Sequence, residues 1–416
     1  MSVSQLTSEV SMSFVPVELS LVNPGFADTV PSPAHDSMTE PGRIEYLACN
    51  PLSYLTVTRS HSDIGPGESA TVDELETANL KSLDHLLEMG AFDPPSVGCF
   101  HLYELSIAGH SQVGVVGGVA TEDFDGGRIK PHEQINPKRA AALARHFQVV
   151  QVQSSPIALG ARRSESLYEI KQRITAEAPD LTVETEDGLT QRVWIVKDHH
   201  DNATIGSELG TSNLYVLDGH HRAAAAVELK KQMMRESANH SLAVIFDIDD
   251  MANHPFHRVL PGIFSTDELM GHFQEVTSVR LLDLPSMLTT IDQAMDLCHG
   301  DELPVYIGDS WYAMDAPANP DDISVLAELA PQRVHGLLMN VLGKAGYDSS
   351  AIGYRSGLIP IEHLIEEIDQ HGGALAGMAP VSMDELLRVA DAGYTMPPKS
   401  TYFEPKVRAG VFLRRM

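Results

Sequence analysis

The stretch that most restricts the fold of this chain is Leu214–Arg222, which reads LYVLDGHHR and is followed by four alanines. An apolar run typical of a buried strand ends at Asp218, and a strong helix-forming sequence begins at Arg222. Gly219 allows the tight turn that such a strand-to-helix junction needs. Strand-like segments recur at 111–120 and 241–248, with helix-like segments between them. This alternation predicts an α/β fold, with α+β as the alternative.

Helix starts are marked by capping boxes, in which a Ser or Thr and a Glu three residues later each accept a hydrogen bond from the other's backbone N–H. The three boxes pair Thr71 with Glu74, Ser265 with Glu268, and Ser382 with Glu385. Asn136 followed by a proline marks a fourth helix start, because Asn is a favoured N-cap and Pro a favoured first helical residue.

The length of 416 residues is enough for two or three domains. We expect an N-terminal region over residues 1–95, a catalytic core over 96–262 that contains the strand–turn–helix stretch, and a C-terminal lobe over 263–416. Lys and Arg number 29 against 57 Asp and Glu, which gives a formal charge of −28. This charge excludes a general binder of nucleic-acid backbones, because such proteins present a net basic face.

The sequence also bears on location. No apolar run approaches the roughly 18 residues that a membrane-spanning helix needs. No Lys or Arg precedes Arg43, so a secretory signal is not expected. Cys49, Cys99 and Cys298 are odd in number and scattered, which fits a reducing compartment. We therefore expect a cytoplasmic protein with neither a membrane nor a nucleic-acid partner.

The junction at Gly219 carries polar groups that suit phosphate. The start of the helix offers free N–H groups and positive potential, and His220, His221 and Arg222 add donors there. Arg222 can bind phosphate through two parallel hydrogen bonds, and Asp218 is placed to meet a metal ion or a reacting hydroxyl. The alternative is structural: Asp218 caps the helix, Arg222 pairs with it, and the histidines are ordinary polar residues. Zinc is disfavoured because no Cys or spaced His completes a ligand set.

A second polar stretch, residues 127–139, reads GRIKPHEQINPKR. Glu133 lies just before the helix capped by Asn136, where the helix dipole favours a carboxylate. The structural alternative is that Glu133 only complements the dipole. Arg128 and Lys130 either neutralise phosphates or line a solvated edge.

Two further segments have open readings. Pro397–Thr401 either closes over the active site, with Lys399 as a phosphate donor, or is a tail strand that completes a sheet. No Walker A sequence is present. The nearest glycine-rich run, 114–118, lacks the lysine, and we predict that it serves strand packing.

The segments IKPHEQINPKRAAALARHF and LDGHHRAAAA resemble the ParB-like free-serine kinases, whose pattern is a PHE segment entering a helix and then a strand, DGHHR and a helix. Over nearly its whole length the chain is similar to the domain of unknown function 1015 family. The supporting segments are NPLSYLTVTRS, DGGRIKPHEQ, LYVLDGHHRAAAA and the ending VSMDELLRVADAGYTMPPKSTYFEPKVRAGVFLRRM. This resemblance implies a ParB/serine-kinase-like catalytic core with N-terminal and C-terminal flanking lobes.

By this resemblance, Glu133 would deprotonate or position a substrate hydroxyl, and Asp218 would share that work or hold Mg²⁺. His220, His221 and Arg222 would bind the nucleotide phosphates. The implied activity is a Mg²⁺-dependent kinase that uses ATP or ADP to phosphorylate the hydroxyl of free L-serine or a similar small amino or hydroxy acid.

The chain departs from the pattern in two places. The early Pro-Pro-Tyr-Asp segment of the family is Ser32-Pro-Ala-His-Asp36 here, which retains only the aspartate. The PHE and DGHHR segments lie further apart than in the compact serine kinases, and the extra residues, 160–210, would form a lid or reshape the substrate pocket. Three alternatives stay open: a ParB-like switch that binds CTP or ATP without phosphorylating a small molecule, a metal-dependent phosphatase or nuclease, and a structural protein without a ligand.

Overall fold

The computed structural model describes residues 13–34, 37–65, 67, 69–233, 235–285, 287–319 and 322–416. The chain divides into two compact units. The first unit comprises the described residues of Met1–Pro131, Ile135–Met251 and Pro405–Met416, and the second comprises His132–Gln134 and Ala252–Glu404.

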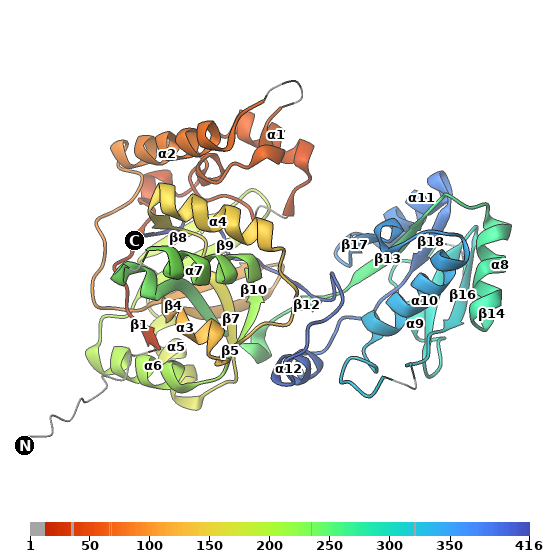
Figure 1. Ribbon diagram of the computed structural model, residues 1–416. Helices are drawn as coiled ribbons and strands as arrows, with labels where there is room; N and C mark the ends of the chain where they lie inside the picture. Colours follow the sequence, from red (N-terminus) through yellow and green to blue (C-terminus); the bar gives the residue numbers. More distant parts are fainter. Residues whose placement is uncertain are drawn as a thin grey trace, which may run out of the picture. The chain divides into compact units, whose positions relative to one another are not determined.

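The sheet of the first unit is mixed (Figure 1). Its strands are β1 (Phe14–Val15), β3 (His101–Ile107), β4 (His110–Ala120), β5 (Ile129–Lys130), β7 (Ile157–Ala161), β8 (Leu181–Glu184), β9 (Thr190–Ile195), β10 (Leu214–Asp218) and β11 (His240–Asp247). The strand order is β5-β10-β7-β11-β4-β3-β9-β8, and β1 pairs with β4. β10 is parallel to β5 and antiparallel to β7, whereas β11 is parallel to β7. The carboxyl ends of β5 and β10 therefore lie at the same edge of the sheet.

The first unit contains seven helices in the described residues. They are α1 (Glu40–Cys49), α2 (Val72–Glu88), α3 (Glu122–Asp125), α4 (Pro137–Val150), α5 (Glu165–Thr175), α6 (His199–Thr211) and α7 (His220–Met233). α4 and α7 lie side by side in front of the sheet in Figure 1. Leu167 of α5 and Ile205 of α6 share a buried core with strand residues such as Leu102, Val115 and Leu159. In the described part of the chain no helix is long and apolar enough to cross a membrane.

Segments from the early and the last described parts of the chain pair in a smaller sheet. β20 (Phe412–Arg415) pairs with β2 (Ser20–Leu21) on one side and with β6 (Val152–Gln153) on the other. These pairings place the described residues of 1–95 and the last residues of the chain in the same unit as β10. The expected division into the consecutive regions 1–95, 96–262 and 263–416 differs from this arrangement. Pairing between strands that are far apart in the sequence cannot be recognised from local sequence patterns.

The helix starts and the fold class agree with the sequence. All three predicted capping boxes form, and in the first of them the Thr71 N–H donates to Glu74 Oε2 at 2.8 Å. The Asn136 side chain caps α4, and a strand, a glycine turn and a helix follow one another at Gly219. The one difference there is that α7 begins at His220, two residues before the predicted start. The mixed α/β fold class is confirmed.

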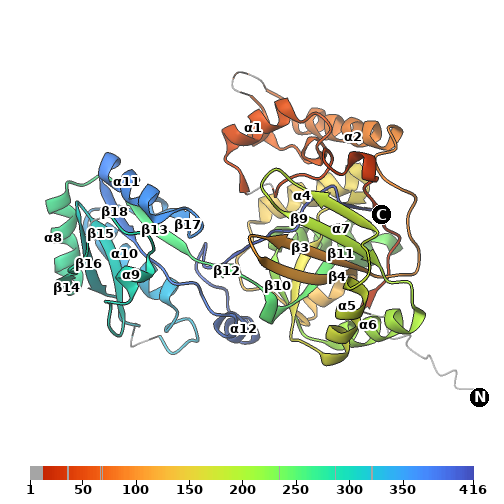
Figure 2. The same ribbon diagram turned by 180° about the vertical axis from the view of Figure 1, so that it is seen from behind.

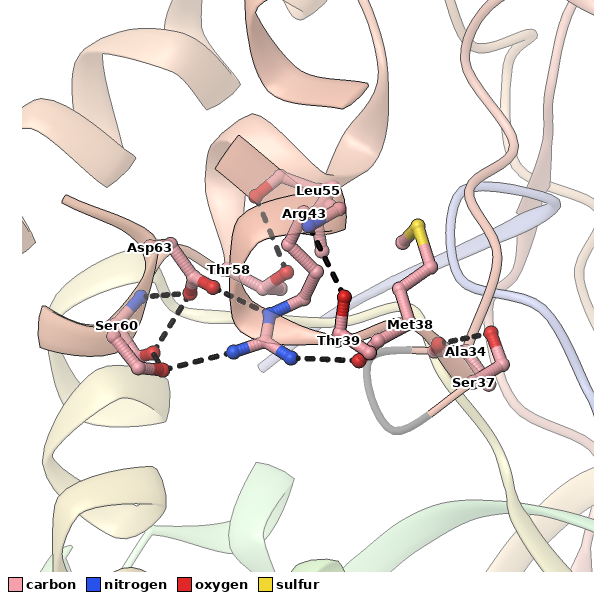
Figure 3. Close-up of polar contacts among 11 residues, drawn as sticks. Ala34, Ser37, Met38, Thr39, Arg43, Leu55, Thr58, Ser60 and Asp63 are labelled. Atoms are coloured by element: carbon pink, nitrogen blue, oxygen red, sulfur yellow. Dashed lines mark hydrogen bonds and ion pairs between the residues drawn. The ribbon is translucent and has the colours of Figure 1, made fainter. Parts of the chain in front are cut away.

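A buried ion pair fixes α1 to the segment that follows it (Figure 3). Arg43 Nε lies 2.5 Å from Asp63 Oδ1, and the two side chains are 6% and 0% exposed. Arg43 Nη1 also donates to the Met38 carbonyl at 3.0 Å, and the Ser60 N–H donates to Asp63 Oδ2 at 2.7 Å. Both charged groups are therefore satisfied, as a buried pair must be. Of the Ser32–Asp36 segment, residues 35 and 36 lie outside the described residues.

The second unit is a helix–sheet–helix arrangement (Figure 2). Its strands are β12 (Asn253–His254), β13 (Phe256–Pro261), β14 (Val279–Leu281), β15 (Glu302–Ile307), β16 (Ser310–Asp315), β17 (Gly353–Ser356), β18 (Gly373–Ala376) and β19 (Tyr402–Phe403), and its helices are α8 (Thr266–Val276), α9 (Asp292–Met295), α10 (Ala330–Lys344), α11 (Ile361–His371) and α12 (Met383–Asp391). The antiparallel sheet has the order β14-β16-β15-β18-β13-β17, and β12 pairs with β19. α8 and α10 cover one face, and α9 and α11 the other.

The glycine-rich run of β4 serves packing, as predicted. A Cβ atom at Gly117 would lie 2.8 Å from the rings of both Phe14 and Phe100. These two rings are fully buried and stack with their centroids 4.9 Å apart. Gly117 is therefore needed for the close approach of β4 to this aromatic pair.

We predict that Gly117→Ala lowers the free energy of unfolding by about 1–3 kcal/mol, because the added methyl overpacks the aromatic pair. Gly336→Ala is the matched control. Gly336 lies inside α10 with open space around its Cα, so this substitution should stabilise by about 0.5–1 kcal/mol. Urea unfolding of both variants measures the difference, and an unchanged midpoint for Gly117→Ala would contradict the packing role.

Candidate functional site

The candidate site is built on the turn between β10 and α7. Gly219 has a φ of +93°, a left-handed value that favours glycine. A Cβ atom there would also lie 2.7 Å from Nε of Arg222, whose guanidinium folds back over the turn. Glycine thus serves two purposes at this position: it closes the turn, and it leaves room for the arginine that follows.

Asp218 is held between two cations. Arg222 Nη2 pairs with Asp218 Oδ2, and Lys406 Nζ lies 3.4 Å from Asp218 Oδ1. Arg222 Nη1 also donates to the hydroxyl of Ser155, in the segment before β7. The side chains of Asp218, Arg222 and Lys406 are 27%, 18% and 7% exposed. These four residues form what we call the Asp218 cluster, in which two positive charges meet one negative charge.

Lys130 lies on the strand beside the cluster. It is the last residue of β5 and is paired in register with Tyr215 of β10. Its Nζ lies 5.8 Å from the centre of the Tyr215 ring. Arg128 is used differently, because it donates to the carbonyls of Leu209 and Ser212 at 3.1 and 2.8 Å and pairs with Asp123. These contacts give Arg128 a structural role.

The starts of α4 and α7 meet next to the cluster. The backbone N–H of Asn136, the N-cap of α4, donates to Nε2 of His221 at 3.0 Å. Because Nε2 accepts this bond, the proton of the neutral ring is on Nδ1. Burial, and then the charge of Arg139, lower the pKa of His221. Two helix N-termini therefore lie at one edge of the sheet, where their N–H groups favour an anion.

His220 points into the protein. The residue is only 5% exposed. Burial, followed by the charges of His221 and Arg222, lowers its pKa to about 3. His220 is therefore neutral at physiological pH and offers phosphate a hydrogen-bond donor at most, not a charge.

Glu133 and Lys399 belong to the second unit. The carbonyl of His132 accepts a hydrogen bond from the Met396 N–H at 2.8 Å, and His132 Nε2 lies 3.1 Å from the Thr401 hydroxyl. The half-buried Glu133 follows directly. Lys399 is exposed, with its Nζ 5.0 Å from the centre of the Phe256 ring. The closure of Pro397–Thr401 over an active site stays a prediction.

Six of the eight predicted site residues belong to the first unit, and the other two belong to the second. Asp218, Gly219, His220, His221 and Arg222 lie at the turn from β10 to α7, and Lys130 lies on the neighbouring β5, opposite Tyr215. Glu133 and Lys399 lie in the second unit. Sequence reasoning missed Lys406 and Ser155, which no motif near the DGHHR stretch signals.

The residues at this edge do not form a protein-only metal site. Within the described ranges, no group of three or more His, Cys, Asp or Glu side chains could hold a metal ion. Both oxygens of Asp218 already face cations, which would repel a further cation. A role for Asp218 as a Mg²⁺ ligand therefore does not fit its surroundings.

We predict that His220 makes the free energy of unfolding depend on pH. Its folded-state pKa of about 3 lies below the ordinary histidine value of about 6.5. The unfolded chain therefore binds a proton that the folded protein does not, so the stabilisation is complete above about pH 6.5 and is lost as pH falls toward 3. Between pH 6.5 and 5 the loss amounts to at most about 2 kcal/mol.

Urea unfolding at these two pH values measures the effect. His220→Gln should reduce the difference between them, whereas His85→Gln, which replaces an exposed histidine of α2, should leave it unchanged. An NMR titration that places the midpoint of the His220 ring near pH 6.5 would contradict the neutral, buried state.

Three solved structures are similar to this chain at low identity. A free serine kinase in complex with AMP is 14% identical, with 72% of this chain and 91% of that chain covered and a TM-score of 0.36. SbnI with a C-terminal truncation, from Staphylococcus aureus, is 14% identical, with 71% and 85% covered and a TM-score of 0.36. A conserved hypothetical protein from Pyrococcus furiosus is 12% identical, with 72% and 95% covered and a TM-score of 0.36.

The search of curated proteins found no match. The sequence model of one family, described as "Protein of unknown function (DUF1015)", matches residues 16–337, which is more than half of the chain. The chain therefore belongs to the DUF1015 family.

Proposed function

We propose that this protein is a nucleotide-dependent kinase that phosphorylates the hydroxyl of free L-serine or of a similar small amino or hydroxy acid, with ATP or ADP as the phosphate donor. The observation that carries the proposal is the Asp218 cluster, in which Arg222 and Lys406 both face the Asp218 carboxylate at the edge where α4 and α7 begin. The resemblance of the PHE and DGHHR segments to the free-serine kinases supplies the reaction class.

Phosphoryl transfer depends mainly on positioning and charge neutralisation. Arg222 and Lys406 bind the nucleotide phosphates, and Lys130 reaches them from β5. Asp218 holds the two cations in place, so that less side-chain freedom is lost when the nucleotide binds. The backbone N–H groups after Gly219 complete the cradle, with His221 as a neutral donor. Mg²⁺ enters only as the ion that accompanies the phosphates and partly neutralises their charge.

Glu133 is the proposed general base. Two residues separate it from Lys130 on one side and from Asn136 on the other, and both of these belong to the first unit, which carries the Asp218 cluster. The chain reaches at most about 11 Å over three positions, and the proposed role of Glu133 relies on this reach. The substrate hydroxyl oxygen forms a bond to the terminal phosphorus, the bond from that phosphorus to its bridging oxygen breaks, and the hydroxyl proton passes to the Glu133 carboxylate. The products are the phosphorylated acid and ADP from ATP, or AMP from ADP.

The direct test is to incubate the purified full-length protein with ATP or ADP, Mg²⁺ and a pool of hydroxy amino acids. Mass spectrometry should detect an amino acid that has gained one phosphate. Nucleotide binding without any phosphorylated product would favour the switch, and release of inorganic phosphate alone would favour a phosphatase.

We predict that Arg222→Ala weakens nucleotide binding by about 10–100-fold, the value of one charge-assisted hydrogen-bonded contact. The fold should survive, because Lys406 still pairs with Asp218. Arg162→Ala is the matched control, since Arg162 is exposed and follows β7 at the end opposite to Ser155. Calorimetry on the two folded variants measures both affinities. Equal affinities would remove Arg222 from the phosphate site.

We predict that Glu133→Gln keeps the nucleotide affinity but lowers turnover by about 10²–10⁴, the range that general-base assistance supplies. Glu122→Gln serves as the control, because Glu122 is an exposed glutamate that pairs with Lys230. Product formation and nucleotide affinity are measured in parallel on both variants. Turnover within about threefold of the wild type, far less than this range, would show that Glu133 is not the base.

A further inference from the structure

Arg258 of β13 is a buried cation without a carboxylate partner among the described residues. The residue is 2% exposed. Its Nη1 donates to the carbonyl of Phe256 at 2.6 Å, and its Nη2 reaches the carbonyl of Pro398 at 3.4 Å. The guanidinium carbon lies 4.8 Å from the centre of the Tyr354 ring. Nε has no hydrogen-bond partner in the described part of the chain.

The surroundings of Arg258 do not supply the missing negative charge. Burial, and then the charge of Arg258, lower the pKa of His335 and bring that of His257 to about 4. Both histidines are therefore neutral near pH 7. Burial also lowers the pKa of Arg258 itself to about 10. A buried guanidinium in this setting carries a large desolvation cost that an anion would relieve.

Other arginines of the chain show the two usual ways in which the N–H groups of a guanidinium are satisfied, by a carboxylate or by several neutral oxygens. Arg355 of the neighbouring β17 pairs with Glu367 through two nitrogens. The buried Arg414 has no carboxylate partner within the described ranges, but it makes three hydrogen bonds of 2.8 Å, to the Gln153 side chain and to the carbonyls of His240 and Ser237. Arg258 is satisfied in neither way.

The unsatisfied side of Arg258 is the side that recognises oxyanions. Nε and Nη2 form one edge of the guanidinium, and this edge binds a carboxylate or a phosphate through two parallel hydrogen bonds. Here Nε is without a partner and Nη2 has only the long contact with Pro398. Nη1, on the other side, is held by Phe256.

The contact with Pro398 belongs to the segment Pro397–Thr401, which is partly exposed. Pro398 and Lys399 are exposed. Lys399 has a φ of +57°, which costs a residue with a side chain about 1–2 kcal/mol. Its ammonium lies over the Phe256 ring, so it is a second cation beside the same strand.

We propose that Arg258 anchors a binding site for a small oxyanion, the carboxylate or phosphate group of a metabolite, which enters when Pro397–Thr401 moves aside. The anion takes Nε and Nη2 of Arg258, replacing the Pro398 carbonyl, and Lys399 adds a second positive charge. This site lies wholly in the second unit, and it stands whether or not the protein is a kinase.

The test is thermal unfolding of the full-length protein in sodium phosphate, sodium acetate and sodium chloride at equal ionic strength. Phosphate or acetate should raise the midpoint of the wild type by about 3 °C relative to chloride, and the anion with the larger shift identifies the preferred group. Arg258→Met should lose this shift, whereas Arg355→Met, which removes a paired arginine of the same sheet, should keep it. The same shift in Arg258→Met and the wild type, or no shift in the wild type, would overturn the proposal.

A crystal of the wild type soaked in selenate gives an answer that needs no variant. An anomalous selenium peak within hydrogen-bond distance of Arg258 Nε supports the site. Selenium peaks only at other positions would show adventitious ions and count against it.

Discussion

The candidate site depends on the carboxylate of Asp218 between Arg222 and Lys406. This single group joins the end of β10, the first turn of α7 and the C-terminal segment that carries Lys406. Its negative charge lies between two largely buried cations, and this placement favours their coming together at one point. Gly219 makes the arrangement possible, because any side chain there would occupy the space of the Arg222 guanidinium.

Features that depend on residues close in the sequence could be predicted from it. The capping boxes join residues three apart, and Asp218 and Arg222 are four residues apart. The spacing of these residues in the sequence is therefore enough to predict that they can interact. Lys406 and Ser155 contact Asp218 and Arg222 from segments far away in the sequence. No rule of residue spacing predicts such contacts. The pairing of β20 with β2 and β6 could not be predicted from the sequence for the same reason.

Three adjacent donors of the DGHHR motif have different roles because consecutive residues of a helix point about 100° apart. His220 turns into the protein, where burial keeps it neutral. His221 accepts a hydrogen bond from the start of α4. Arg222 alone folds back to Asp218. The sequence predicted a cluster of donors at the turn, but which of them carries charge is decided by the depth at which each side chain lies.

The overall charge of −28 gave no sign of these cationic sites, because net charge mainly describes the surface, where charged groups are solvated. In the interior the cost of desolvation decides, and each buried cation must be satisfied by its own neighbours. Lys406 faces a carboxylate and Arg414 has three short hydrogen bonds to neutral oxygens. Arg258 is buried as deeply as Arg414, yet its Nε–Nη2 edge has only one long contact. Incomplete satisfaction, rather than burial, therefore separates an arginine that supports the fold from one that is placed to receive an anion.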